Sequence, residues 1–368
     1  MAKKENTPEK KLKELIDQKL GDELGSISSI KKLPNVSVKA NLYHANSTKK
    51  GEIIIKTSKE HKSVNYEKDT KRSDWIGVEG SALELSQQQQ IRDCATPKFY
   101  GRISENGKAS TIIIEYIKGK TLETIVQNKK SIKNILEEIT NNLIKLHIDW
   151  KKNDGEFIYK CRLEKQKGYA EKFAKYICTI YNYLHQQELS QENKRKIKEL
   201  FENDILKYFS EVENRLSGII HNALHPQHII QREEDKKYIF IDLSSISYGP
   251  LLFDILDLLY YPNIKNKIAQ KDIEELIKYY IKEQVLEKED RSFIEKAAPY
   301  LAIYRTVRAA TKPILLKNNF PEIFKNLKKI VPNYENFPTS YIETVKSQLE
   351  NYFEENKEYK EYLMELLS

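Results

Sequence analysis

The hydrophobic pattern is mainly strand-like in the first third of the chain and mainly helical after it, and this change restricts the fold more than any other feature. Between Ile27 and about Ile117, short runs rich in β-branched residues, such as GEIIIKTS and STIIIEYI, are bounded by turn signals and predict strands. One segment among them, DWIGVEGSALELSQQQQI, has the apolar spacing of a helix, and after Thr121 most segments share that spacing. We therefore expect an α+β fold, with a small β-rich lobe followed by a larger helical lobe.

A short β-like island interrupts the helical part. It is the segment GIIHNALHPQHIIQREEDKKYIFIDLSS, in which HII and KKYIFIDL predict two strands joined by a charged turn. The expected organisation is a charged arm or helix over residues 1–26, a β-rich lobe over 27–117, and a helical lobe over 118–368 that contains an island over 218–254. This order favours a two-lobed, kinase-type architecture.

Composition excludes several classes of protein. No apolar run reaches the roughly 18 residues of a membrane span, and the N-terminus MAKKENTPEKKLKEL lacks the apolar segment of a signal peptide. We therefore expect a cytoplasmic protein. The net charge is +8, but the lysines are interleaved with glutamates along the chain, which is typical of solvated helix faces and makes a nucleic-acid partner an unfavoured interpretation.

The island carries the most specific motif of the chain. It resembles the core of the aminoglycoside phosphotransferase and choline kinase family, relatives of protein kinases, whose members have a loop H-G-D-L-H-P-x-N, a strand, and then I-D followed by Gly and Asp. The positions that match this pattern are His221, Leu224, His225, Pro226, Ile241, Asp242, Tyr248, Gly249 and Asp254. Weaker matches extend the resemblance to roughly residues 27–320. The resemblance implies a bilobal protein-kinase-like fold that binds ATP or GTP with Mg²⁺.

The resemblance also implies a nucleotide site in the β-rich lobe. Lys56, at the end of the strand EIIIK, fits the lysine that binds the nucleotide phosphates. Glu79 in VEGSALEL is the expected partner of that lysine, and Glu84 is the reserve candidate. The hinge whose backbone would bind adenine is Glu115, Tyr116 and Ile117.

The family pattern further implies a metal site in the island. Asp242 follows a strand and would bind Mg²⁺. His228 stands where most relatives have a metal-binding asparagine, and macrolide phosphotransferases resemble this chain in having His there; a neutral imidazole can ligate a divalent ion. His221 and His225 would brace the loop, and Asp254 would tether it.

Ala223 is the main departure from the family. The aspartate expected there orients the acceptor hydroxyl and takes its proton, which a methyl group cannot do. His225 is a substitute base only if its ring turns toward the acceptor. The first hairpin, LPNVSVKANLY, also lacks the glycine that lets backbone amides approach phosphates.

Several functions therefore stay open. The first is a pseudokinase, or an inactivated phosphotransferase, that keeps its Mg-ATP site. The second is an active ATP-dependent O-phosphotransferase on a small hydroxylated molecule such as an antibiotic, a sugar or an amino alcohol. The third is a non-catalytic scaffold that acts through a protein partner. A different reaction, such as nucleotidyl transfer, is also compatible with the absence of the catalytic aspartate.

The helical lobe would supply the wall of an acceptor pocket. Three acidic residues there are candidates to face a cationic acceptor: Asp257, Glu274 and Glu275. Four tyrosines either line an aromatic pocket or pack between helices: Tyr260, Tyr261, Tyr279 and Tyr280.

Overall fold

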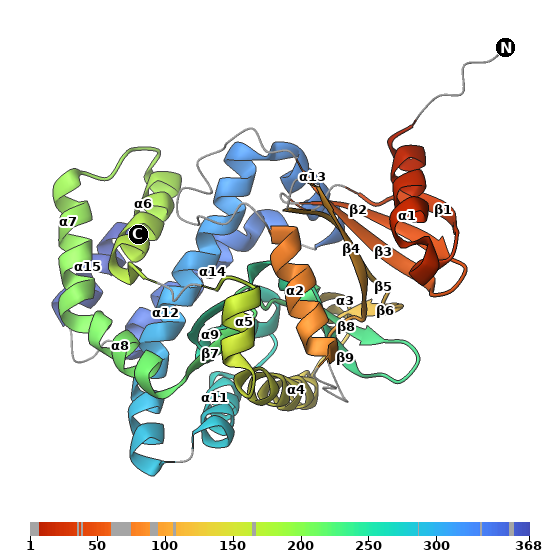
Figure 1. The fold of residues 1–368 in the computed structure, drawn as a ribbon. Helices are drawn as coiled ribbons and strands as arrows, with labels where there is room; N and C mark the ends of the chain where they lie inside the picture. The colour runs from red at the N-terminus through yellow and green to blue at the C-terminus, as the bar shows by residue number, and fades with distance from the viewer. Residues whose placement is uncertain are drawn as a thin grey trace.

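The structure, a computed structural model, describes residues 7–34, 37, 40–59, 75–88, 95–105, 108–163, 167–285, 287–331, 333–352 and 357–368. Within this part the chain forms a small β-rich lobe and a larger helical lobe (Figure 1). The elements of the small lobe are α1 (Pro8–Leu24), β1 (Ile27–Lys32), β2 (Ala40–Ser47), β3 (Gly51–Ser58), α2 (Trp75–Gln88), β4 (Phe99–Glu105) and β5 (Lys108–Glu115). The α+β, bilobal expectation is confirmed.

The five strands of the small lobe form one antiparallel sheet in the order β1-β2-β3-β5-β4. Because side chains alternate between the faces of a strand, Ile53 and Ile55 of β3 pack with α1, in a cluster that includes Ile16. Ile54 packs on the opposite side, in the cluster that contains Leu85 of α2. Two residues along from Ile54, Lys56 is on the α2 side as well.

The large lobe is built mainly from helices. They are α3 (Leu122–Gln127), α4 (Lys133–Lys151), α5 (Asp154–Lys160), α6 (Tyr169–His185), α7 (Gln191–Leu200), a π-helical turn (Phe201–Ile205), α8 (Leu206–Arg215), α9 (Leu252–Leu259), α10 (Pro262–Lys265), α11 (Gln270–Gln284), α12 (Lys288–Asn319), α13 (Pro321–Ile330), α14 (Phe337–Tyr352) and α15 (Lys357–Leu367). None of the helices in the described ranges is long and apolar enough to cross a membrane.

The island forms two small antiparallel sheets. β7 (Ser217–Ile220) pairs with β10 (Ser247–Pro250), while β8 (Ile229–Arg232) lies between β6 (Gly119–Thr121) and β9 (Tyr238–Phe240). The backbone N–H of Ile241 donates to the carbonyl of His228 at 2.9 Å. The 221–228 loop, which connects β7 to β8, is thereby joined to the segment that follows β9.

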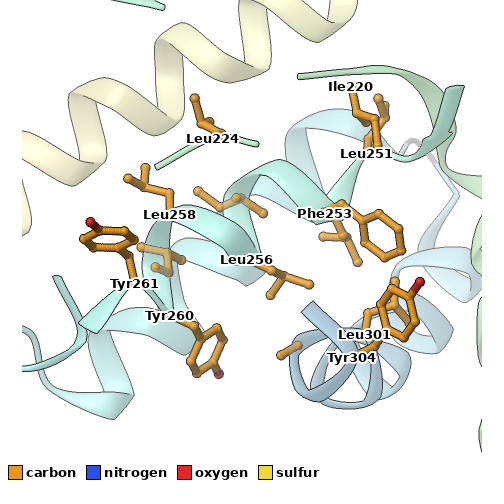
Figure 2. Packing of buried hydrophobic residues seen from close by; sticks show 14 of the residues in the cluster. Ile220, Leu224, Leu251, Phe253, Leu256, Leu258, Tyr260, Tyr261, Leu301 and Tyr304 are labelled. Atoms are coloured by element: carbon orange, nitrogen blue, oxygen red, sulfur yellow. The ribbon is translucent and has the colours of Figure 1, made fainter. Parts of the chain in front are cut away.

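A dense apolar layer supports this loop. Leu224 in the loop is fully buried and lies next to Leu258 of α9 in Figure 2, where Leu301 and Tyr304 of α12 pack near the other end of α9. Burial of a leucine-sized side chain contributes about 1.5–3 kcal/mol. The 221–228 loop thus rests on α9, and α9 rests on α12.

Candidate functional site

Lys56 connects the two lobes. Its Nζ lies 2.6 Å from Oε1 of Glu79 on α2 and 3.6 Å from Oδ1 of Asp242 in the large lobe. The lysine and Glu79 are both buried, with exposed fractions of 9% and 1%. Burial alone would lower the pKa of Lys56, but the carboxylates of Glu79 and Asp242 outweigh it and hold that pKa above its usual value. Lys56 is therefore a fixed positive charge.

The structure distinguishes the two candidate partners of Lys56. Glu79 makes the contact, while Glu84 pairs with Arg102 of β4. The two glutamates are five positions apart on α2, which places them on different sides of the helix.

Asp242 lies at the point where β9 ends and its backbone turns. Its φ of 62° is in the left-handed region, which a non-glycine residue adopts rarely and which is concentrated at functional sites. The side chain is 36% exposed, and its second oxygen, Oδ2, lies 3.3 Å from Nε2 of His228. The carboxylate thus reaches Lys56 with one oxygen and His228 with the other while staying open to solvent.

The ring of His228 is oriented by its own loop. Its Nδ1 lies 2.9 Å from the carbonyl oxygen of Ala223, which can only accept a hydrogen bond, so Nδ1 carries the proton. Burial lowers the pKa of His228 to about 3, against the opposing effect of Asp242, and the ring is neutral. Nε2 therefore presents a lone pair toward Asp242. No cluster of three or more His, Cys, Asp or Glu donors occurs among the residues described.

Asp254, near the start of α9, tethers the 221–228 loop. The carboxylate is fully buried and accepts hydrogen bonds from the backbone N–H groups of His221, at 2.6 Å, and Asn222, at 2.8 Å. It also lies 3.0 Å from Nε2 of His147 on α4. Burial would raise the pKa of Asp254, but the hydrogen bond and charge of His147 outweigh it, so that pKa lies below its usual value.

His147 is a site residue that sequence reasoning missed. It is fully buried, and its Nδ1 contacts the hydroxyl of Tyr280, which donates to the carbonyl of Leu251 at 3.2 Å. The only available signal was a histidine among the apolar positions of NNLIKLHIDW. That pattern does not identify the partner, which is 107 residues away.

Replacing Asp254 with Asn should destabilise the protein by about 3 kcal/mol or more, because two buried backbone N–H groups and the buried ring of His147 lose an ionised hydrogen-bond acceptor. Since the folded-state pKa is depressed, the stability contributed by Asp254 is present above its unfolded pKa of about 4 and is lost as the pH falls through the folded pKa. Urea unfolding of both proteins at several pH values measures this. A difference that stays constant down to the acid transition of the wild type would contradict an ionised Asp254.

The two remaining histidines of the loop have different surroundings. His221 lies with its Nε2 2.8 Å from the carbonyl of Ile241, to which it donates. The ring of His225 lies against that of His228, with centroids 3.8 Å apart, and its Nε2 is 3.4 Å from Nζ of Lys312. Burial is the main cause that holds the pKa of His225 well below its usual value. Its Nε2 thus accepts from the ammonium group of Lys312.

The position of the expected base is occupied by a half-buried Ala223. Before it, Asn222 has a left-handed φ of 59°. The side-chain oxygen of Asn222 accepts from Arg305 and from Arg308 of α12, each at 2.9 Å. The backbone around Ala223 is therefore fixed by α9 on one side and by α12 on the other.

The hinge segment leaves one backbone amide available. The N–H of Glu115 donates to the carbonyl of Lys98 at 2.9 Å, and that of Tyr116 lies 3.4 Å from the carbonyl of Glu52. For Ile117, the part of the chain that the structure describes offers its N–H no partner. In the first predicted hairpin, LPNVSVKANLY, residues 35–36 and 38–39 lie outside the described residues.

The acidic residues expected to face a cationic acceptor are engaged elsewhere. Asp257 forms an ion pair with the buried Arg305, Glu275 lies 2.9 Å from Nζ of Lys133, and Glu274 accepts from Gln270 at 3.1 Å. Of the four tyrosines that were candidates for an aromatic pocket, Tyr260, Tyr261 and Tyr280 are buried and Tyr279 is at the surface.

Comparisons with known proteins agree with this architecture. A model of the phosphotransferase enzyme family matches residues 79–284. Among solved structures, an ethanolamine kinase of Plasmodium vivax has a TM-score of 0.55 and 12% identity, and the match covers 94% of this chain and 96% of that one. The GDP complex of wild-type aminoglycoside 2'-phosphotransferase-IIIa has a TM-score of 0.56 and 13% identity, over 92% of this chain and 100% of that one.

A third similar structure is the macrolide 2'-phosphotransferase of Brachybacterium faecium. Its TM-score is 0.51 at 12% identity, over 88% of this chain and 98% of that one. No curated protein matches the chain in sequence. At identities this low, the likeness to solved structures shows the fold alone, and the site must be interpreted from the residues of this chain.

Proposed function

The chain belongs to the phosphotransferase enzyme family, and on that premise we propose that it binds a Mg²⁺-nucleotide, ATP or GTP, between its lobes while lacking the base that such enzymes use. The observation that supports this most directly is the contact of Lys56 with both Glu79 and Asp242. A lysine held by two carboxylates from different lobes is positioned to bind the phosphates of a nucleotide. The aminoglycoside 2'-phosphotransferase with a similar fold is a GDP complex, which favours a nucleotide ligand here.

Asp242 and His228 are the residues that would hold the metal. Oδ2 of Asp242 and the lone pair of His228 Nε2 face each other at 3.3 Å, and two acceptors at that separation fit a shared divalent cation. Two protein ligands suit Mg²⁺, which usually keeps several waters and takes its other ligands from phosphates. When bound, Mg²⁺ neutralises the phosphate charge that opposes transfer. The tautomer that this role requires is set by the carbonyl of Ala223.

The acceptor side of the proposed reaction is incomplete. The family's aspartate would take the proton of an acceptor hydroxyl, and Ala223 cannot. General-base assistance is worth about 10²–10⁴-fold in rate. We therefore propose a phosphotransferase fold with a retained nucleotide site and, at most, slow transfer to a small hydroxylated molecule.

A double-mutant cycle on Lys56 and Glu79 tests the nucleotide site. Lys56→Met keeps most of the buried aliphatic stem and should weaken Mg²⁺-ATP binding about tenfold or more, because one charge-assisted contact is lost. Glu79→Gln should weaken binding in the wild-type background but add little to Lys56→Met, since Glu79 acts by positioning the lysine. Calorimetric Kd values of the four proteins give the coupling.

Lys120 offers a matched control, because it is an exposed lysine on β6. Lys120→Met should leave the affinity for Mg²⁺-ATP unchanged. If Lys56→Met bound Mg²⁺-ATP as tightly as the wild type and lost only melting temperature, Lys56 would be a structural ion pair and the proposed nucleotide site would be wrong.

A further inference from the structure

One face of α12 presents cations to the 221–228 loop. Arg305, Arg308 and Lys312 are spaced by three and four positions and so share a side of the helix. Arg305 and Arg308 both donate to the side-chain oxygen of Asn222, and Nζ of Lys312 lies 3.4 Å from Nε2 of His225. The three cations therefore border the loop on both sides of Ala223, where the acceptor hydroxyl would be delivered.

These cations differ in how their charge is balanced. Arg305 is buried, lies over the ring of Phe253 and is paired with the carboxylate of Asp257. For Arg308 and Lys312, no carboxylate lies within 4.0 Å in the ranges that the structure describes. Arg305 is thus paired directly with a carboxylate, whereas within the described residues Arg308 and Lys312 have no carboxylate in direct contact.

Arg308 and Lys312 also keep donors for a ligand. Arg308 is half-buried and uses Nη1 and Nη2 only on the two oxygens of Asn222, so part of its five-donor guanidinium is unused. Lys312 is exposed and has three N–H donors, of which His225 takes one. Lys312 also interacts electrostatically with Arg308 and with the carboxylates of Asp242 and Asp257, and desolvation lowers its pKa.

We propose that Arg308 and Lys312 bind an oxyanion, a phosphate or carboxylate group, on the acceptor, so that the substrate class is an anionic hydroxyl compound. The assignment rests on the proposed function, since it places an acceptor beside Ala223. Three observations agree with it: among the described residues no carboxylate lies within 4.0 Å of either cation, Ala223 adds no negative charge that would repel an anion, and Asp257 and Glu275 are already paired. A cationic amine would meet like charge at this position.

Inorganic phosphate is the probe that tests this assignment. It is titrated calorimetrically into the full chain saturated with Mg²⁺ and a non-hydrolysable ATP analogue, and into the full chain alone. The wild type should bind phosphate saturably in both conditions. Arg308→Gln and Lys312→Gln should each raise the phosphate Kd about tenfold, because each removes one charge-assisted contact. Lys296→Gln, at an exposed lysine of the same helix, is the control and should leave that Kd unchanged.

Further variants separate the competing outcomes. Lys312→Gln matters most, because Lys312 contacts only His225 in the loop, whereas Arg308 also braces Asn222. An unchanged phosphate Kd in Lys312→Gln, or no saturable binding to the wild type, would overturn the proposal and leave Arg308 as a brace of the loop. Phosphate binding lost in Lys56→Met, or blocked by the ATP analogue, would also overturn it, because the anion would then occupy the nucleotide site.

The two proposals fail in different ways. If the ATP analogue does not bind while phosphate binding still depends on Arg308 and Lys312, the nucleotide site is wrong and the anion site stands. If the analogue binds normally and Arg308→Gln weakens the analogue instead of phosphate, the cations serve the nucleotide's own phosphates. That second result contradicts an anionic acceptor.

Discussion

Replacing Asp242 with Asn is expected to abolish Mg²⁺-dependent nucleotide binding. The carboxylate lies against both Lys56, at 3.6 Å, and His228, at 3.3 Å. An amide keeps the shape but removes the charge on which a Mg²⁺ ligand depends. Loss of charge-assisted contacts worth about 3 kcal/mol corresponds to about a hundredfold in Kd. Calorimetric titration with ATP, with and without Mg²⁺, measures the loss.

The structure makes this variant a sharp test, because the fold should survive it. Asn tolerates the left-handed backbone of position 242 as well as Asp does, and Lys56 keeps Glu79 as its partner. Asp235→Asn, at an aspartate in the exposed turn between β8 and β9, is the matched control and should bind like the wild type. Mg²⁺-dependent binding that persists in Asp242→Asn would remove Asp242 from the metal site.

Restoring an aspartate at position 223 is expected to raise the turnover of ATP by about 10²–10⁴-fold, the usual contribution of a general base. The surrounding loop is already fixed by Asp254 and Arg308 through Asn222, so a carboxylate at 223 enters a preorganised backbone. Turnover is measured with water and with hydroxylated acceptors, both anionic and cationic.

The control for Ala223→Asp is Ala223→Asn, which has nearly the same size but cannot accept a proton from a hydroxyl. The aspartate variant should turn over ATP much faster than the asparagine variant, with similar nucleotide affinity. If both variants bind nucleotide but turn over ATP only at the wild-type rate, the missing base does not limit the chemistry. That result would favour a protein that works through nucleotide binding alone.

The fold could be predicted because its signals, the strand and helix periods, are local. The contact between Lys56 and Glu79 was expected from the family resemblance, and the structure explains it, because Lys56 lies on the side of its sheet that α2 covers. The loop around His228 and the segment of Asp242 were identified together from the family motif, and in the structure both flank the β8–β9 hairpin. In these cases the partners are connected by a few elements of regular geometry.

The rest of the site depends on contacts between residues far apart in the sequence, which the periodicity of hydrophobic residues within single helices and strands does not predict. His147 and Asp254 are 107 residues apart, and Arg308 meets Asn222 across 86 residues. The packing of α12 on α9 decides which of the α12 cations face the 221–228 loop. The sequence pattern does not specify this packing. For the same reason Asp257 was expected to face an acceptor, although the fold pairs it with Arg305.

Two structural features were also not predicted from the hydrophobic pattern of the sequence. The edge strand β4 has register shifts near Gly101 and Ser104, and these irregularities interrupt the alternation that identifies a strand. The segment KIKELFENDILKYFSEVENRL, which has the spacing of one helix, is divided by a π-helical turn at Phe201–Ile205. An extra residue in a turn shifts the apolar face without removing the helical period.

The most direct test of the account is a calorimetric titration of the unmodified chain with ATP and with GTP, each with and without Mg²⁺. The account predicts saturable binding of at least one nucleotide that is strongest with Mg²⁺, through Lys56, Asp242 and His228. No binding of either nucleotide under any of these conditions would contradict it, and the family resemblance would then describe only how this chain folds.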